Sequence, residues 1–141
     1  MLLKKTVKYE DYNGNTREKV CYFNITKTEL AEMEARTPGG FGNKLARISN
    51  GADGAEIMET FKEIILTAYG EKSEDGELFI KKRNGVRLAD DFEQSAAFDT
   101  LYTELLFDPD KAATFINKIM PQDLVEEVNK AKTSNLPAEN K

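Results

Sequence analysis

Apolar residues between positions 53 and 121 recur every three or four residues, the spacing that places them on one face of an α-helix. Three amphipathic helices are predicted there. The first starts at a cap on Asp53 and ends at Gly70, and the third starts at Asp108-Pro109 and stops at Pro121. The three apolar stripes, in chain order, are Ile57, Met58, Phe61, Ile64, Ile65 and Ala68; Phe98, Leu101, Tyr102, Leu105 and Leu106; and Ala112, Phe115, Ile116 and Ile119. This periodicity predicts a helical core and indicates no chemistry.

The pattern near the N-terminus predicts a β-hairpin over residues 3–26, with its turn at Asn13-Gly14-Asn15. The preferred register has a three-residue loop and places Val7 opposite Cys21, whereas a two-residue loop would pair Val7 with Val20. The preferred register gathers six apolar side chains on one face, each worth about 1.5–3 kcal/mol when buried, against a cost of at most about 1 kcal/mol for two opposed glutamates. These six are Leu3, Val7, Tyr9, Cys21, Phe23 and Ile25.

The remaining elements are predicted from caps, turns and shorter apolar stripes. The first are a short helix from a Thr26 or Thr28 cap to Arg36 and a helical turn around Leu45 and Ile48. A polar turn at residues 72–76 is followed by an extended segment at residues 78–80, and this part of the chain ends at Asn84-Gly85. A helix then runs from Leu88 through Phe92 to Phe107, and a final helix from Pro121 carries Leu124, Val125, Val128 and Ala131.

The fold class that these elements predict is α+β, with an N-terminal β-hairpin followed by a mainly α-helical bundle and a disordered C-terminal tail. A chain of 141 residues has the length of one domain. We expect a single domain over residues 1–132, with the hairpin at 3–26 and the helical core at 28–132. Residues 133–141 have no apolar periodicity and are expected to form a flexible tail.

The chain contains no histidine and a single cysteine, Cys21. These absences exclude Ser-His-Asp and Cys-His catalytic sites and leave no usual ligand set for zinc. Cys21 falls on the apolar face of the hairpin and is interpreted as a small buried residue. Residues 11–22 begin like a calcium loop but lack its glycine and closing glutamate, and residues 39–44 lack the ending of a phosphate-binding loop. We therefore expect no catalytic residues, no metal and no cofactor.

The net charge is −5, with acidic and basic residues mixed along the chain. This balance argues against nucleic-acid binding, which needs a concentrated basic surface. Lys81-Lys82-Arg83 is the only basic cluster and is interpreted as a solvated strand end and turn. The apolar run Met1-Leu2-Leu3 is too short for a signal peptide, and no run approaches the roughly 20 apolar residues of a membrane span. A soluble cytoplasmic protein that binds neither nucleic acid nor membrane is expected.

Several apolar residues lie outside the three central stripes and exceed what one small core is expected to bury. One interpretation is that they all pack inside the molecule. The alternative is that some form a groove for a partner helix. The predicted partner-binding residues are Leu78, Phe79, Ile80, Phe92, Leu124, Val125 and Val128.

Four short motifs occur in a distinctive order between Phe61 and Pro121. They are Phe61-Lys62-Glu63, Tyr69-Gly70-Glu71-Lys72-Ser73-Glu74-Asp75-Gly76, Phe79-Ile80-Lys81, and Phe115-Ile116-Asn117-Lys118-Ile119-Met120-Pro121. In this order the sequence resembles the tail assembly chaperones of tailed bacteriophages that infect mainly Gram-positive hosts. The resemblance covers Ile57 to about Leu124, close to half the chain, and the N-terminal hairpin and C-terminal tail agree with it.

The resemblance implies a non-catalytic chaperone of siphovirus tail assembly. Such proteins coat the long, largely helical tape measure protein, keep it soluble and help the major tail tube protein to polymerise around it. They act in the cytoplasm of the infected bacterial host and are absent from the mature virion, and many are also made in a longer, frameshifted form.

Two other functions remain open at this point. The first is a structural tail or connector protein that is retained in the virion, and the second is a small enzyme that uses carboxylates. A homo-oligomer is also compatible with the pattern, through the exposed edge of the hairpin or the apolar face of the last helix.

Overall fold

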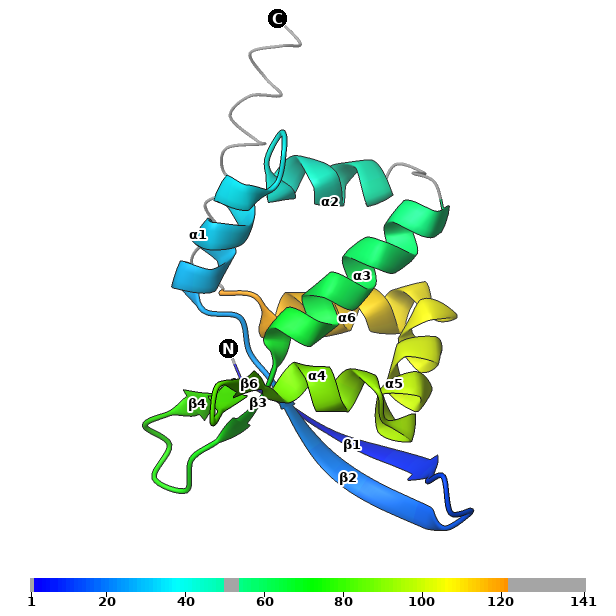
Figure 1. Ribbon diagram of the computed structural model, residues 1–141. Helices are drawn as coiled ribbons and strands as arrows, with labels where there is room; N and C mark the ends of the chain where they lie inside the picture. The colour runs from blue at the N-terminus through cyan, green and yellow to red at the C-terminus, as the bar shows by residue number, and fades with distance from the viewer. Residues whose placement is uncertain (1, 50–53, 122–141) are drawn as a thin grey trace, which may run out of the picture.

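The computed structural model of the chain describes residues 2–49 and 54–121 (Figure 1). Its elements confirm the predicted α+β class, with strands first and helices predominating after them. In chain order they are β1 (Leu3–Glu10), β2 (Thr16–Phe23), α1 (Lys27–Arg36), α2 (Phe41–Ser49), α3 (Gly54–Ala68), β3 (Tyr69–Lys72), β4 (Phe79–Ile80), β5 (Lys82–Arg83), β6 (Val86–Arg87), α4 (Leu88–Glu93), α5 (Ala96–Leu106) and α6 (Pro109–Ile119).

The N-terminal hairpin is present, but both registers considered from the sequence are wrong. The strands pair with Lys5 opposite Cys21 and Val7 opposite Lys19, two residues away from the preferred register. The cause is a five-residue loop, in which the Asp11 carboxylate accepts hydrogen bonds from the backbone N–H groups of Asn13 and Asn15, each at 2.9 Å. A capped loop of this kind fixes strand register independently of the strand pattern.

The two-residue shift leaves the apolar face unchanged, because side chains alternate with a period of two. Val7 and Cys21 are therefore buried as predicted. The shift also removes the opposed glutamates: Lys8 now faces Glu18, and their charged groups are 3.9 Å apart. The observed register thus combines the predicted burial with a favourable cross-strand pair.

The hairpin is extended into a four-stranded antiparallel sheet in the order β1-β2-β3-β4. The prediction that Gly70 ends the preceding helix is wrong. Helix α3 stops at Ala68 and the chain passes directly into β3, where Gly70 pairs with Tyr22 of β2. The extended segment predicted at residues 78–80 is confirmed by strand β4, which pairs with β3.

Two further details differ from the sequence prediction. A small hairpin, β5–β6, turns at Asn84 and Gly85, whose φ angles of 55° and 78° are the positive values that a tight two-residue turn requires. The helix predicted from Leu88 to Phe107 is divided into α4 and α5. Ser95 separates them, because its hydroxyl caps α5 by accepting from the backbone N–H of Phe98 at 3.2 Å.

The predicted caps of two other helices are confirmed. Thr26 and Glu29 form a reciprocal capping box at the start of α1. Asp108 caps α6 by accepting from the backbone N–H of Lys111, with Pro109 in the first turn, and α6 ends before Pro121. The predicted Asp53 cap, the final helix from Pro121 and the tail at 133–141 lie outside the described residues, so the domain limits remain a prediction.

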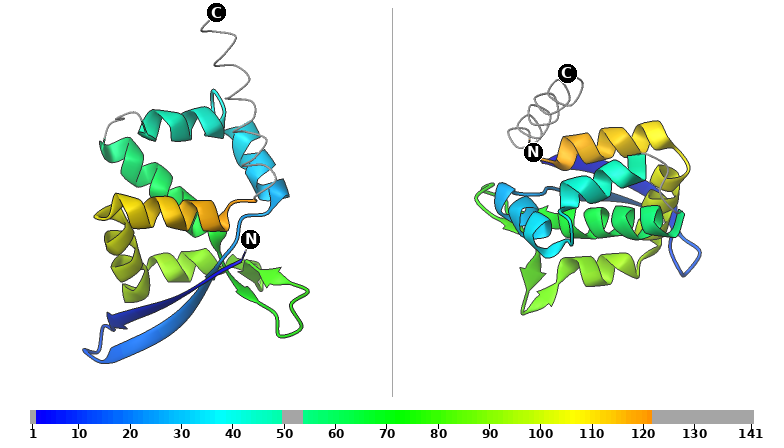
Figure 2. Two further views of the ribbon diagram at one scale, coloured as in Figure 1. Left: turned by 180° about the vertical axis from the view of Figure 1, so that it is seen from behind. Right: turned by 90° about the horizontal axis from the view of Figure 1, so that it is seen from above.

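The helices gather on one side of the sheet, and the core lies between them (Figures 1 and 2). Its centre is an aromatic cluster in which Phe23 contacts Phe115 edge-to-face at 5.1 Å and Tyr69 stacks on Phe92 at 3.9 Å. A backbone hydrogen bond of 3.1 Å from Ile25 to the carbonyl of residue 119 joins the end of β2 to the end of α6. This packing ties the sheet to the last described helix.

Candidate functional site

A groove of about 550 Å³ lies between α1 on one side and the β5–β6 hairpin on the other. Its floor is formed by Leu66 of α3, Tyr69 of β3 and Ala89 of α4. Tyr69 and Ala89 are buried and Leu66 is half-buried. We refer to this feature as the α1–hairpin groove. An apolar floor within an open groove is typical of a surface that binds another protein segment.

The two walls of the α1–hairpin groove carry different charges. On α1, Glu29 and Glu32 are three residues apart and so share a helix face, with Arg36 one turn further along. On the opposite side, Lys82 and Arg87 come from β5 and β6. The groove is therefore acidic along most of α1 and basic along the hairpin.

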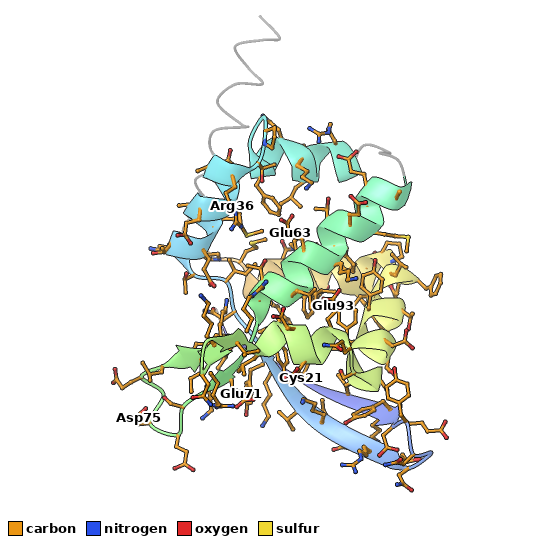
Figure 3. All side chains as sticks on the ribbon, in the orientation of Figure 1. Cys21, Arg36, Glu63, Glu71, Asp75 and Glu93 are labelled. Atoms are coloured by element: carbon orange, nitrogen blue, oxygen red, sulfur yellow. The ribbon has the colours of Figure 1, made fainter. Side chains whose placement is uncertain are left out.

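Most of these rim charges have no counter-ion within the part of the chain that the structure describes. Glu32, Arg36, Lys82 and Arg87 are all exposed, and no ion pair among residues 2–49 and 54–121 involves them. Figure 3 shows the side chain of Arg36 directed from α1 into the space beside α3. Solvated, unpaired charges around an apolar floor are free to pair with charges on a ligand.

Glu63 lies at the α3 side of the same groove (Figure 3). Its carboxylate is 3.6 Å from the ammonium group of Lys44 on α2. That pair is partly exposed, so its contribution to stability is small. Its main effect is to tie α2 to α3, and Glu63 adds a third acidic group to the groove, after Glu29 and Glu32.

Lys81 holds the two walls of the groove together. Its ammonium group donates to the Glu29 carboxylate at 2.6 Å, to the backbone carbonyl of Thr67 at 2.7 Å and to that of Asn24 at 2.8 Å. All three ammonium protons are thus used, by α1, by the end of α3 and by the segment after β2. Burial lowers the pKa of Lys81, an effect that the Glu29 carboxylate opposes.

The sequence interpretation of Lys81-Lys82-Arg83 as a solvated cluster is therefore wrong for its first member. Lys81 is half-buried, whereas Lys82 and Arg83 are exposed. The Phe79 ring lies 5.6 Å from the Lys81 ammonium group and adds a cation–π contact. No local pattern distinguishes Lys81 from its neighbours, because its three acceptors come from distant parts of the chain.

The predicted partner-binding residues of the 78–80 segment lie next to the groove, on the chain that leads to Lys81. Leu78 is 63% exposed, while Phe79 and Ile80 are half-buried. The Phe79 ring packs on Gly70, where a Cβ atom would lie 2.6 Å from the ring. Val86 of β6, which the sequence prediction did not include, is 53% exposed. Leu78 and Val86 thus add apolar surface to the small hairpins.

The structure does not bring the other predicted residues to this surface. Phe92 is 3% exposed, and its ring is stacked on Tyr69 within the aromatic core. Leu124, Val125 and Val128 lie outside the described residues. In the described conformation, the apolar surface beside the groove consists of Leu78 and Val86, with Phe79 and Ile80 partly covered.

The described residues contain no group of three or more Cys, Asp or Glu side chains that is placed to hold a metal ion. Cys21 is buried, and burial raises the pKa of its thiol to about 11. No described helix combines the length and the apolar character needed to cross a membrane.

A family model described as phage tail assembly chaperone matches residues 2–141, which is nearly the whole chain. No curated protein and no solved structure matches it. The family match agrees with the resemblance carried by the motifs between Phe61 and Pro121. The chain belongs to the phage tail assembly chaperone family.

Proposed function

We propose that this protein binds the tape measure protein of its phage, keeps that protein soluble and promotes assembly of the tail tube around it. It does so in the cytoplasm of the infected host, by non-covalent contacts, and it leaves the tail before the virion is complete. Family membership supports a role in tail assembly. The identity of the partner follows from the motif resemblance, which implies a long, largely helical tape measure protein.

The observation that carries this proposal is the α1–hairpin groove, with its apolar floor between an acidic and a basic side. An amphipathic helix bound there would place its apolar stripe on Leu66, the half-buried apolar residue of the groove. Its two polar flanks would need opposite charges, basic toward Glu32 and acidic toward Lys82 and Arg87. Charge complementarity of this kind fixes the direction in which a helix lies as well as its affinity.

The exposed residues on the small hairpins extend the same contact surface. Leu78 and Val86 are 63% and 53% exposed, so each can bury apolar area when a partner covers it. A helix that is longer than the groove would reach them after leaving the floor. We therefore include Leu78 and Val86 in the proposed tape measure interface, together with the groove.

Co-expression with the tape measure protein of the same phage tests the proposal. Reversing the basic side with Lys82→Glu and Arg87→Glu should lower the soluble fraction of the partner and weaken binding about tenfold, since two exposed ion pairs become repulsive. The matched control is Arg47→Glu with Lys62→Glu, which makes the same charge change at two partly exposed positions that line neither groove. This control should leave tape measure binding within about twofold of wild type.

Two results would contradict the proposal. One is a tape measure protein that is equally soluble with and without this chain. The other is an equal loss of binding in the groove variant and in the control, which would assign the effect to net charge alone. Mass spectrometry of purified virions separately tests departure from the tail, because a structural tail protein would be found there at a fixed copy number. Light scattering of the complex measures how many copies bind each tape measure chain.

A further inference from the structure

Strand β1 forms one edge of the four-stranded sheet, since the strand order is β1-β2-β3-β4. A strand at an edge has one row of backbone N–H and C=O groups without a partner strand. The pairing of the loop shows which residues of β1 carry this row. The backbone N–H of Asp11 donates to the carbonyl of Asn15 at 2.8 Å, so this pair points its polar groups toward the partner strand.

In an antiparallel ladder, hydrogen-bonded pairs alternate with pairs that face outward. The odd-numbered residues of β1 therefore bond to β2, and the even-numbered residues point their N–H and C=O groups away from the sheet. Asn24 confirms the alternation, because its N–H donates to the carbonyl of Ala68 on the β3 side at 2.8 Å. The outward row of β1 thus consists of Lys4, Thr6, Lys8 and Glu10, whose side chains are also exposed.

A second groove, of about 500 Å³, lies between the start of this edge and helix α6. It is lined by Leu3 and Lys4 on the strand and by Lys118 and Phe115 on the helix, and Figure 2 shows α6 beside the start of β1. We refer to it as the β1–α6 groove. Because it begins at the free edge of β1, a segment bound in it can reach the outward row of that strand.

Four lysines and two carboxylates, Glu104 and Asp110, line the β1–α6 groove, so its charge is predominantly basic. Two of its lysines, Lys5 and Lys111, share a single acidic partner, Glu104, at 3.7 and 3.2 Å. The other two, Lys4 and Lys118, are exposed and have no ion pair within the described parts of the chain. In a protein of net charge −5 the groove is thus a local excess of positive charge, with four lysines against two carboxylates.

Lysines on an edge strand also oppose unwanted strand pairing. They disfavour pairing with a lysine-bearing strand in particular, because the like charges repel each other. Two copies of this chain that paired through β1 would bring both sets of Lys4 and Lys8 into one ribbon, together with the basic groove on each copy. A segment that carries carboxylates would meet the same lysines favourably. The edge is therefore selective for the charge of the strand that it accepts.

We propose that the free edge of β1 and the β1–α6 groove bind an extended, acidic segment of a partner protein, which adds a fifth strand to the sheet. The segment bonds to the backbone of Lys4, Thr6 and Lys8, and its carboxylates pair with Lys4 and Lys118. This interface is separate from the α1–hairpin groove, so it lets one chaperone molecule hold a helical segment and an extended segment together.

A synthetic seven-residue peptide of alternating glutamate and valine tests the interface on the full chain, with the lysine–valine peptide as its control. Amide hydrogen exchange, followed residue by residue by NMR, should slow about tenfold or more at Lys4, Thr6 and Lys8 when the acidic peptide is saturating. The odd-numbered amides Val7 and Tyr9, already bonded to β2, should change little. Slowing that follows no odd–even pattern, or equal binding of both peptides, would overturn the proposal.

Two variants separate backbone pairing from charge attraction. Thr6→Pro removes one outward N–H group and should weaken the acidic peptide at least about tenfold, whereas Thr6→Val should not. If Thr6→Pro does not fold, Lys4→Glu with Lys118→Glu should give the same loss without touching the backbone. Lys82→Glu with Arg87→Glu should have no effect, which distinguishes this site from the tape measure groove. Two results would refute an acidic partner strand. One is wild-type peptide binding by both Thr6→Pro and the Lys4→Glu, Lys118→Glu variant. The other is self-association of the wild-type chain that is lost in Thr6→Pro.

Discussion

Replacing Lys81 with methionine tests how the α1–hairpin groove keeps its shape. Methionine has a similar length but donates no hydrogen bond, so the substitution removes three donors and little volume. Three acceptors then lose their partner: the Glu29 carboxylate, with 25% of its side chain exposed, and the carbonyls of Asn24 and Thr67. These acceptors belong to α1, to the segment after β2 and to α3, which are the parts that frame the groove.

The expected loss can be worked out from these contacts. All three bonds are donated by a charged ammonium group, and a hydrogen bond that involves a charged group is worth about 1.5–3 kcal/mol, which would suggest roughly 5–9 kcal/mol for the set. Two effects reduce this figure. Burial lowers the pKa of Lys81, which shows that placing its charge there is itself unfavourable, and the partly exposed Glu29 can regain water. We therefore expect Lys81→Met to lower the free energy of unfolding by about 2 kcal/mol.

Urea unfolding followed by circular dichroism measures this loss, and thermal unfolding should show a midpoint lower by about 6–10 °C. The matched control is Lys82→Met. Lys82 is exposed and takes part in no ion pair among the described residues, so its substitution should change the free energy of unfolding by less than about 0.5 kcal/mol. Equal midpoints for the two variants would refute the assigned role of Lys81.

A double-variant cycle with Glu29→Gln identifies the source of the loss. Glutamine can still cap α1 but carries no charge, so the change should cost less in the Lys81→Met background than in wild type. The pH dependence gives an independent test. Because the folded-state pKa of Lys81 lies below its ordinary value of 10.5, the unfolded chain holds this proton longer than the folded chain does. The Lys81 contribution to stability should rise as pH rises toward 10.5, and Lys81→Met should remove that rise.

Three further predictions concern single positions in the core and the sheet. Thr60→Val should raise the free energy of unfolding by roughly 1 kcal/mol in urea titrations, since the buried Thr60 hydroxyl has no hydrogen-bond partner among the described atoms. Gly70→Ala should lower it by about 1–3 kcal/mol because the new Cβ would lie 2.6 Å from the Phe79 ring, whereas Gly54→Ala, with no atom within 4 Å, should be neutral or stabilising. Burial raises the pKa of Cys21 from 9.0 to about 11, so the folded chain keeps this proton after the unfolded chain has lost it. Stability should therefore fall by roughly 2–3 kcal/mol between pH 9 and 11, and Cys21→Ala should remove that fall.

Each of the three has a clear contradicting result. A destabilised Thr60→Val would mean that the hydroxyl is bonded after all, and a neutral Gly70→Ala would mean that β4 moves away freely. For the cysteine, the difference in stability between wild type and Cys21→Ala should be constant up to pH 9 and change above it. A difference that stays constant to pH 11 would show that the thiol ionises equally in the folded and unfolded chain.

Local chemistry in the sequence was enough to place most helices. Thr26 and Asp108 were identified as caps because their hydroxyl and carboxylate bond to backbone only three residues away. Ser95 has the same chemistry, but continuous apolar periodicity on both sides hid the break between α4 and α5. The hairpin register failed for a related reason: the Asp11 carboxylate builds a loop of its own, and strand patterning contains no information on that loop.

The candidate site could not be predicted in full, because it depends on contacts between residues that are far apart in the sequence. Leu78 was predicted as a partner-binding residue because it lies in a short apolar run after a polar turn, and the structure places it 63% exposed. The groove beside it was not predicted, since Glu32, Leu66 and Arg87 come from three separate elements and only the fold brings them together. The 81–83 cluster contains one half-buried lysine and two exposed cations. This difference likewise depends on acceptors more than ten residues away from Lys81.

The order in which the sheet is completed has a consequence for synthesis of the protein. Strands β1 and β2 are neighbours in the chain, but β2 pairs on its other side with β3, and the partners Phe23 and Tyr69 are 46 residues apart. At roughly 5–20 residues per second, a ribosome takes about 2–9 seconds to add that stretch. During this interval the nascent hairpin carries Phe23 on an open strand, and the host's own folding factors have time to engage it before β3 arrives.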